Sequence, residues 1–169
     1  ITYWDVSSVT NMSEMFKDNS NFNQALDWDV SSVVNMYQMF NNASSFMGAL
    51  MDEGDMDIGW DVSSVTDMGG MFAGATIFNT DISSWDVSNV TNMSSMFKDA
   101  ENFNRDLSGW NVSNVTNMRS MFFGASSFNG DISTWNVSNL TGNHDNMFNG
   151  ATNFNSDISS WDVSNLTSM

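Results

Sequence analysis

The chain has 169 residues, of which 20 are acidic and four are basic, so its formal net charge is −16 at pH 7. This charge disfavours nucleic acid and anionic lipid as partners, and it leaves cations, cationic proteins and neutral glycans open. The absence of cysteine excludes disulfides and thiolate metal sites without identifying a compartment. No apolar run approaches the ~20 residues that span a bilayer, so we expect no membrane insertion by this segment.

Seven tryptophans, each followed by Asp or Asn, then Val, then Ser, divide the chain into similar units. They are mostly 25 residues apart, with single spacings of 24, 32 and 26. A period in this range predicts a stacked repeat array. We expect residues 1–169 to form one array of six near-complete coils and a partial seventh, as part of a longer protein, with an insertion loop at 51–59. The tryptophans, which we expect to form an inward structural column, are Trp4, Trp28, Trp60, Trp85, Trp110, Trp135 and Trp161.

Each unit opens with a strand pattern. In the unit at residues 82–103, apolar residues follow the spacing of a leucine-rich repeat. Alternation places a short strand at roughly Trp85 to Ser88, with Trp85 and Val87 inward and Asp86 and Ser88 on the open face.

A helical pattern follows the strand pattern. In T-N-M-x-x-M-F-x-x-A the apolar residues recur at i, i+3, i+4 and i+7, and Thr91 is a suitable helix N-cap. The sequence therefore predicts an α/β repeat solenoid, a leucine-rich-repeat-like right-handed coil. Each coil would have a short parallel strand at W-D/N-V-S and a short helix at T-N-M-x-x-M-F-x-x-A.

The motif at residues 85–110, W-D-V-S-N-V-T-N-M-S-S-M-F-K-D-A-E-N-F-N-R-D-L-S-G-W, resembles the BspA-like bacterial surface-protein repeats. The resemblance extends over essentially all 169 residues. It implies a leucine-rich-repeat-related array that is secreted or displayed on the cell surface and associated with adhesion. The family brings no catalytic residues to this chain.

The residue after each tryptophan is the candidate ligand position on the open face. Aspartates stacked at a strand spacing of about 4.8 Å repel one another by about 1 kcal/mol in water, so the row stays hydrated or recruits cations. A solvated face, calcium and a hydroxyl-rich ligand are the alternatives. The row comprises Asp5, Asp29, Asp61, Asp86, Asn111, Asn136 and Asp162.

The insertion loop is the candidate metal site. Asp52, Asp55 and Asp57 stand close together around a glycine, and calcium accepts such irregular oxygen-rich loops. The spacing differs from that of an EF-hand, and a solvated acidic loop is the alternative. Apart from possible Ca²⁺, the sequence implies no cofactor.

The repeat offers no catalytic constellation. His144, the sole histidine, has no paired nucleophile in the pattern, and the translated aspartates lack the asymmetry that an acid and a base need. The Met-x-x-Met pairs are typical of core packing rather than of copper sites. We therefore expect a protein without enzymatic activity.

The uniform open face favours a repetitive ligand. We expect an extracellular or cell-surface module, an adhesin segment or stalk, that binds glycans, matrix or host and neighbouring surface proteins weakly and multivalently. One alternative is an ice- or lattice-binding array that uses the threonine row, which we expect at helix caps. Another is a passive spacer or a self-associating filament component.

Overall fold

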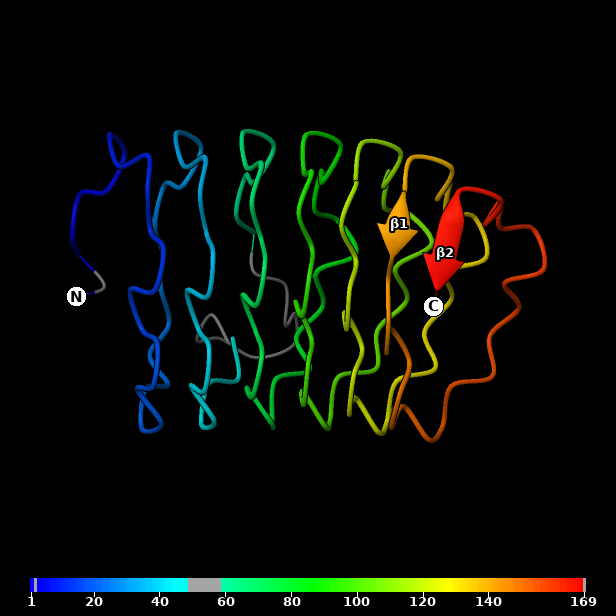
Figure 1. The fold of residues 1–169 in the computed structure, drawn as a ribbon. Helices are drawn as coiled ribbons and strands as arrows, with labels where there is room; N and C mark the ends of the chain where they lie inside the picture. The colour runs from blue at the N-terminus through cyan, green and yellow to red at the C-terminus, as the bar shows by residue number, and fades with distance from the viewer. Residues whose placement is uncertain (2, 49–58, 169) are drawn as a thin grey trace.

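The chain winds into successive coils that lie side by side in a row from the N-terminal end to the C-terminal end (Figure 1). The computed structural model describes residues 1, 3–48 and 59–168. Within these residues it contains no helix and two short strands, β1 (Gly142–Asn143) and β2 (Leu166–Ser168). The strands pair in parallel, with an irregularity in register between Gly142 and Asn143.

The predicted α/β leucine-rich-repeat-like solenoid is therefore wrong in both of its elements. The W-D/N-V-S motif forms a corner instead of a strand, because the valine carbonyl closes a turn: Val90 N–H donates to Val87 O at 2.9 Å. Parallel pairing occurs later in the unit, at the residue that follows the threonine. These isolated bridges join Asn11 to Asn35, Asn35 to Asp67, Asp67 to Asn92, and Asn92 to Asn117.

The segment predicted as a helix is a run of turns. An α-helix needs negative φ throughout, but Ser95 and Asp99 have φ of 55°. Met96 N–H donates to Met93 O at 3.2 Å, three residues back, where a helix would use the fourth. The Ser95 N–H donates to Arg119 O of the next coil at 2.8 Å. Alternate amides therefore close turns within a coil or join it to the next.

The apolar periodicity of this segment nevertheless corresponds to burial. Met93, Met96, Phe97 and Ala100 are all fully buried. Turns and a helix can bury the same positions, since the spacing of apolar residues constrains which side chains point inward and not how the backbone is bonded. This ambiguity explains why the helix prediction failed while its apolar positions were placed in the core.

Two columns of phenylalanine rings run through the described coils. In the first, rings of neighbouring coils lie 5.4–5.9 Å apart. In the second they lie 5.8–6.0 Å apart, and the two rings of one coil are only 3.9–4.1 Å apart. The columns are Phe16, Phe40, Phe72, Phe97, Phe122 and Phe148, and Phe22, Phe46, Phe78, Phe103, Phe128 and Phe154.

The tryptophans lie beside these columns. All are buried except Trp4, which is 55% exposed at the N-terminal end. Trp110 and Trp135 stack at 6.4 Å with nearly parallel rings, and Trp135 stacks on Trp161 at 6.1 Å. The indole N–H of Trp110 donates to Ile82 O of the preceding coil at 3.0 Å. Each such indole therefore contributes apolar area, and the hydrogen bond pairs an indole N–H that burial would otherwise leave without an acceptor.

Candidate functional site

The residues after the tryptophans form an exposed row whose side chains fix the corners of the coils. The Asp86 Oδ1 accepts the Ser88 backbone N–H at 3.0 Å. The Asn111 Oδ1 accepts both the backbone N–H and the hydroxyl of Ser113, at 3.2 and 2.8 Å. The same backbone contact is made by Asp5, Asp29, Asp61, Asn136 and Asp162. Because Asn serves as well as Asp, the corner needs an acceptor oxygen and not a charge.

The serine contacts also lower the pKa of the aspartates in this row. Hydrogen bonds from the Ser31 hydroxyl and backbone N–H lower the pKa of Asp29, while the neighbouring charges of Asp61 and Asp5 oppose the shift. The pKa of Asp86 is lowered by Ser88 in the same way. These carboxylates are ionised at neutral pH. Their recurrence along the chain is explained by the corner contact that each makes within its own coil.

The same contact, an Asp or Asn oxygen that accepts the backbone N–H two residues ahead, forms corners at two other places in the repeat. The sequence patterns did not predict these corners. The Asp81 Oδ1 accepts the Ser83 N–H at 2.9 Å, and the Asn92 Oδ1 accepts the Ser94 N–H at 3.1 Å. Asp or Asn followed two residues later by a turn amide is a recognisable sequence signal. It recurs up to three times in a unit, with Ala25 replacing the aspartate of one corner in the first unit, so it could have indicated a cornered coil.

Threonine side chains form a second exposed row, on the other side of the Val87–Val90 turn from Asp86. The backbone N–H of Thr91 donates to Thr66 O, and that of Thr116 donates to Thr91 O, both at 2.9 Å. The Thr91 and Thr116 hydroxyls donate to the same carbonyls at 3.2 Å. The expectation that this row lies at helix caps is wrong, because these threonines lie in an intercoil ladder.

Asparagine side chains run beside the threonines and bridge the coils as well. The Asn89 Nδ2 donates to Ser63 O at 2.8 Å, and the Asn114 Nδ2 donates to Ser88 O at 2.7 Å. Asn139 and Asn165 bond to Ser113 and Ser138 in the same way. We call the two rows together the Thr/Asn face: Thr66, Thr91, Thr116 and Thr141 with Asn89, Asn114, Asn139 and Asn165. All eight residues are exposed and neutral.

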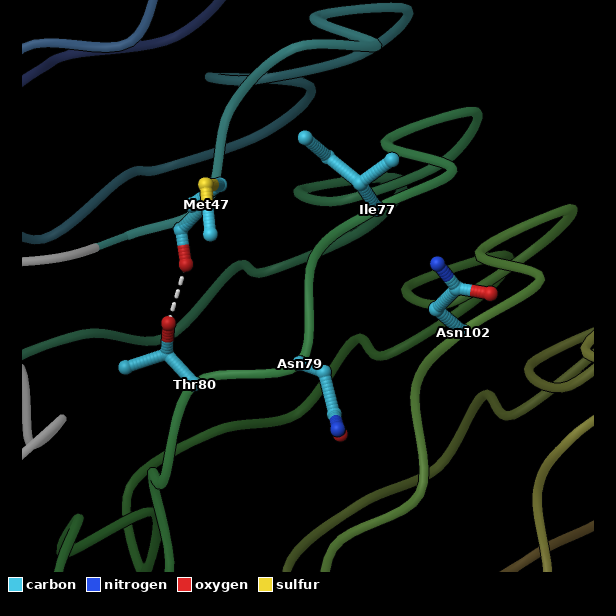
Figure 2. Close-up of a pocket in the computed structure, with 5 residues that line it drawn as sticks. All are labelled: Met47, Ile77, Asn79, Thr80 and Asn102. Carbon is cyan, nitrogen blue, oxygen red and sulfur yellow. Dashed lines mark hydrogen bonds between the residues drawn. The ribbon is translucent and has the colours of Figure 1, made fainter.

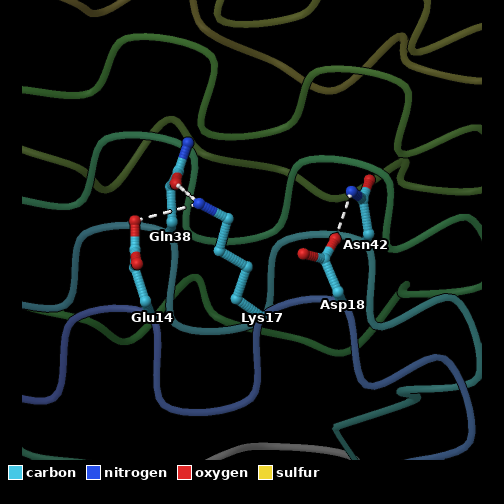
Figure 3. A network of polar contacts seen from close by, with 5 residues as sticks. All are labelled: Glu14, Lys17, Asp18, Gln38 and Asn42. Atoms are coloured by element: carbon cyan, nitrogen blue, oxygen red, sulfur yellow. Dashed lines mark hydrogen bonds and ion pairs between the residues drawn. The ribbon is translucent and has the colours of Figure 1, made fainter.

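Side chains at and beside the positive-φ residues of the first two coils form a third set of contacts between coils (Figure 3). Lys17 Nζ lies 2.9 Å from Glu14 Oε1 and 2.7 Å from Gln38 Oε1. Asn42 Nδ2 donates to Asp18 Oδ1 at 2.7 Å. The hydrogen bond that Lys17 donates to the Glu14 carboxylate raises the pKa of Lys17. These groups are solvated, so the network stabilises the coils only slightly.

The predicted metal ligands Asp52, Asp55 and Asp57 lie outside the described residues, as does most of the predicted insertion loop at 51–59. Within residues 1, 3–48 and 59–168, no group of three or more His, Asp or Glu side chains could hold a metal ion. The same part of the chain has no helix with the length and apolar character needed to cross a membrane.

His144 takes the place of a buried methionine. It aligns with Met118 and Met93 of the preceding coils, and Gly142 is the inserted residue before it. Its side chain is 2% exposed, with Nε2 at 3.3 Å from Thr116 O. Nδ1 has no hydrogen-bond partner among the described residues. Its burial is that of a core residue, and among the described residues neither ring nitrogen is hydrogen-bonded to a serine hydroxyl or a carboxylate, as a catalytic triad requires.

A family model described as "Mycoplasma protein of unknown function, DUF285" matches residues 1–53, 49–147 and 110–169. These matches extend over the whole chain, so the chain belongs to this repeat family. The prediction of a repeat protein is confirmed by the overlapping matches. No curated protein matches the chain, and no solved structure does.

Proposed function

We propose that the chain is a non-enzymatic, BspA-like repeat array on the cell surface or outside the cell, which serves as an adhesin segment or stalk. The observation that carries the proposal is the Thr/Asn face, where the same neutral groups recur coil after coil in the same ladder. We place the ligand contacts there rather than on the post-tryptophan row, because the Oδ1 atom of each Asp and Asn in that row is engaged in a corner.

The chemistry of this face favours neutral glycans. A threonine hydroxyl that donates to a carbonyl retains acceptor capacity, and an asparagine amide presents both donors and acceptors. A sugar polymer offers hydroxyls at repeated intervals, so several weak contacts can form along one chain. Their combined affinity exceeds that of any single contact without requiring a deep pocket. Matrix proteins and neighbouring surface proteins that carry such glycans are suitable partners.

The aspartates support a binding role better than a catalytic one. Hydrolysis of glycosidic bonds uses two carboxyl groups with separated pKa values, one of them raised. Hydrogen bonds from the serine two residues ahead are the main cause of a lowered pKa in eight aspartates: Asp5, Asp29, Asp61, Asp81, Asp86, Asp131, Asp157 and Asp162. Equivalent carboxylates of this kind do not supply an acid and a base.

The test uses two matched triple variants and immobilised neutral glycans or matrix. Thr66→Val, Thr91→Val and Thr116→Val together remove hydroxyls and retain the backbone ladder, and Val34 shows that valine is accepted at this position. We expect this variant to lose binding. The control, Asp29→Asn, Asp61→Asn and Asp86→Asn, should bind like the native chain with or without calcium. Binding that is abolished by the second variant and retained by the first would contradict the proposal.

A lattice-binding function is the second candidate, and one observation favours it. The threonine row lies in a regular intercoil ladder, which can present hydroxyls at an even spacing to a crystal surface. Thermal hysteresis of the native chain that the triple threonine variant lacks would support this function. If neither glycan binding nor hysteresis is measurable, a passive spacer or filament component is the remaining function.

A further inference from the structure

A ladder of asparagine side chains is interrupted at Met47. In most coils the Asn after the second phenylalanine accepts the backbone N–H of the equivalent residue in the next coil. Asn79 Oδ1 accepts from Asn104 at 2.9 Å, and Asn104 Oδ1 accepts from Asn129 at 2.8 Å. The ladder also joins Asn23 to Met47 and Asn129 to Asn155. Met47 has no amide oxygen, and among the described residues nothing accepts the Asn79 backbone N–H.

A cavity lies at this interruption (Figure 2). It has a volume of about 380 Å³ and is lined by Met47, Ile77, Asn79, Thr80 and Asn102. Met47 and Ile77 are 45% and 38% exposed, which makes them two of the exposed apolar side chains of the chain. Thr80 is buried, and its hydroxyl donates to the Met47 carbonyl. The cavity therefore combines an apolar wall, an amide N–H that has no acceptor among the described residues, and the neutral side chains of Asn79 and Asn102.

The repeat itself indicates which chemical group this site takes. Wherever the ladder continues, the equivalent N–H is bonded to a carboxamide oxygen. The interruption therefore leaves a position for an amide oxygen supplied from outside, next to two apolar side chains that can cover a methyl group. A carboxylate could also accept the N–H, but no basic side chain lines the cavity and the chain carries a net charge of −16.

We propose that this cavity binds the acetamido group of an N-acetylated sugar. The acetamido oxygen accepts the Asn79 N–H, and its methyl group lies against Met47 and Ile77. The carboxamides of Asn79 and Asn102 exchange hydrogen bonds with the ring hydroxyls. The cavity volume falls within the usual range for small-ligand sites. The site is separate from the Thr/Asn face, so this proposal and the proposed function can fail independently.

The test is a titration followed by the NMR signal of the Asn79 backbone amide. The probes are a β-linked dimer of N-acetylglucosamine, the matching glucose dimer and free acetamide. We expect the acetylated dimer to shift the Asn79 signal saturably and at lower concentration than acetamide, and the glucose dimer to leave it unchanged. The proposal is overturned if the two dimers act alike, if acetamide binds as well as the acetylated dimer, or if nothing shifts the signal.

Two variants separate binding from folding. Met47→Asn restores the ladder residue found in other coils and should weaken binding of the acetylated dimer at least about tenfold, the equivalent of one lost hydrogen bond. The same variant should unfold at a higher temperature, so lost binding cannot be ascribed to damage. Ile77→Asn copies Asn102 of the next coil and should weaken binding while leaving the Asn79 N–H unpaired. Unchanged affinity in both variants would refute the site.

Discussion

Replacing Gly124 by alanine distinguishes the observed turns from the helix that the apolar pattern predicts. Gly124 has φ of 69° and follows Phe122 and Phe123 in a segment with a helical apolar spacing. In an α-helix, Gly to Ala stabilises a protein by about 1 kcal/mol. In the turn, an alanine must adopt a left-handed conformation, which costs about 1–2 kcal/mol. Its Cβ would also overlap the Asp99 Oδ1, so that side chain must move.

The net change in the free energy of unfolding depends on these costs and on how alanine restricts the unfolded chain. Displacing the Asp99 carboxylate costs about 0.5–1.5 kcal/mol, and alanine restricts the unfolded state by about 0.4–1 kcal/mol in the opposite direction. We expect Gly124→Ala to lower the free energy of unfolding by about 1–2 kcal/mol, or the melting temperature by about 3–6 °C. Gly124→Asn should cost less than alanine, because Asn adopts the left-handed conformation more readily.

Gly109→Ala is the matched control. Gly109 lacks a positive φ, a Cβ there would meet Ser83 O at an ordinary 3.5 Å, and three other coils have Ser84, Thr134 and Ser160 at this position. Alanine should therefore stabilise the chain by about 0.4–1 kcal/mol. Urea denaturation followed by tryptophan fluorescence measures both variants. A stabilised Gly124→Ala protein would refute the turn structure and restore the helix.

Three other predictions concern the core, the buried histidine and the corners. Phe97→Ala removes ring contacts to Phe72, Phe103 and Phe122. It should destabilise the chain by about 3–5 kcal/mol in the same urea assay. A cost below about 1 kcal/mol would be incompatible with a continuous ring column. His144→Met removes a buried Nδ1 that has no hydrogen-bond partner among the described residues, so it should stabilise the chain by about 1–3 kcal/mol. A destabilised variant would show that Nδ1 has a partner. The folded pKa of Asp29 is lowered, so its contribution to stability is present above the unfolded pKa and is lost as the pH falls through the folded pKa. Ser31→Ala should raise the Asp29 pKa measured by carbon-detected NMR titration, and an unchanged value would show that the serine contact is not its cause.

The sequence was sufficient to predict the repeat and the positions that enter the core, because these depend on which residues recur and at what spacing. Val87, Met93 and Phe97 were assigned inward from that spacing, and all three are buried. The backbone conformation could not be obtained in the same way. Strand, helix and turn are distinguished by where each N–H is bonded, and here the acceptors of alternate amides lie about 25 residues away, in the next coil.

One local signal against the helix was available in the sequence. The residue two positions after the first phenylalanine is Asp18, Asn42, Gly74, Asp99, Gly124 or Gly150, and all six have positive φ. These are the residue types that tolerate the left-handed region. The candidate ligand row stays a prediction: Asp86 and its equivalents are exposed, and each also accepts a hydrogen bond from the serine two residues ahead, which the apolar spacing does not reveal.

The central claim is that repetition along the Thr/Asn face confers function through multiple weak contacts. The most direct measurement is the affinity of the native chain for a neutral glycan that it binds, prepared in lengths that reach one, two or four coils. We predict that the dissociation constant falls at least about tenfold from the shortest ligand to the longest, and that the triple threonine variant removes this dependence. Equal affinity for all lengths would contradict the claim, because it would place binding at one local site.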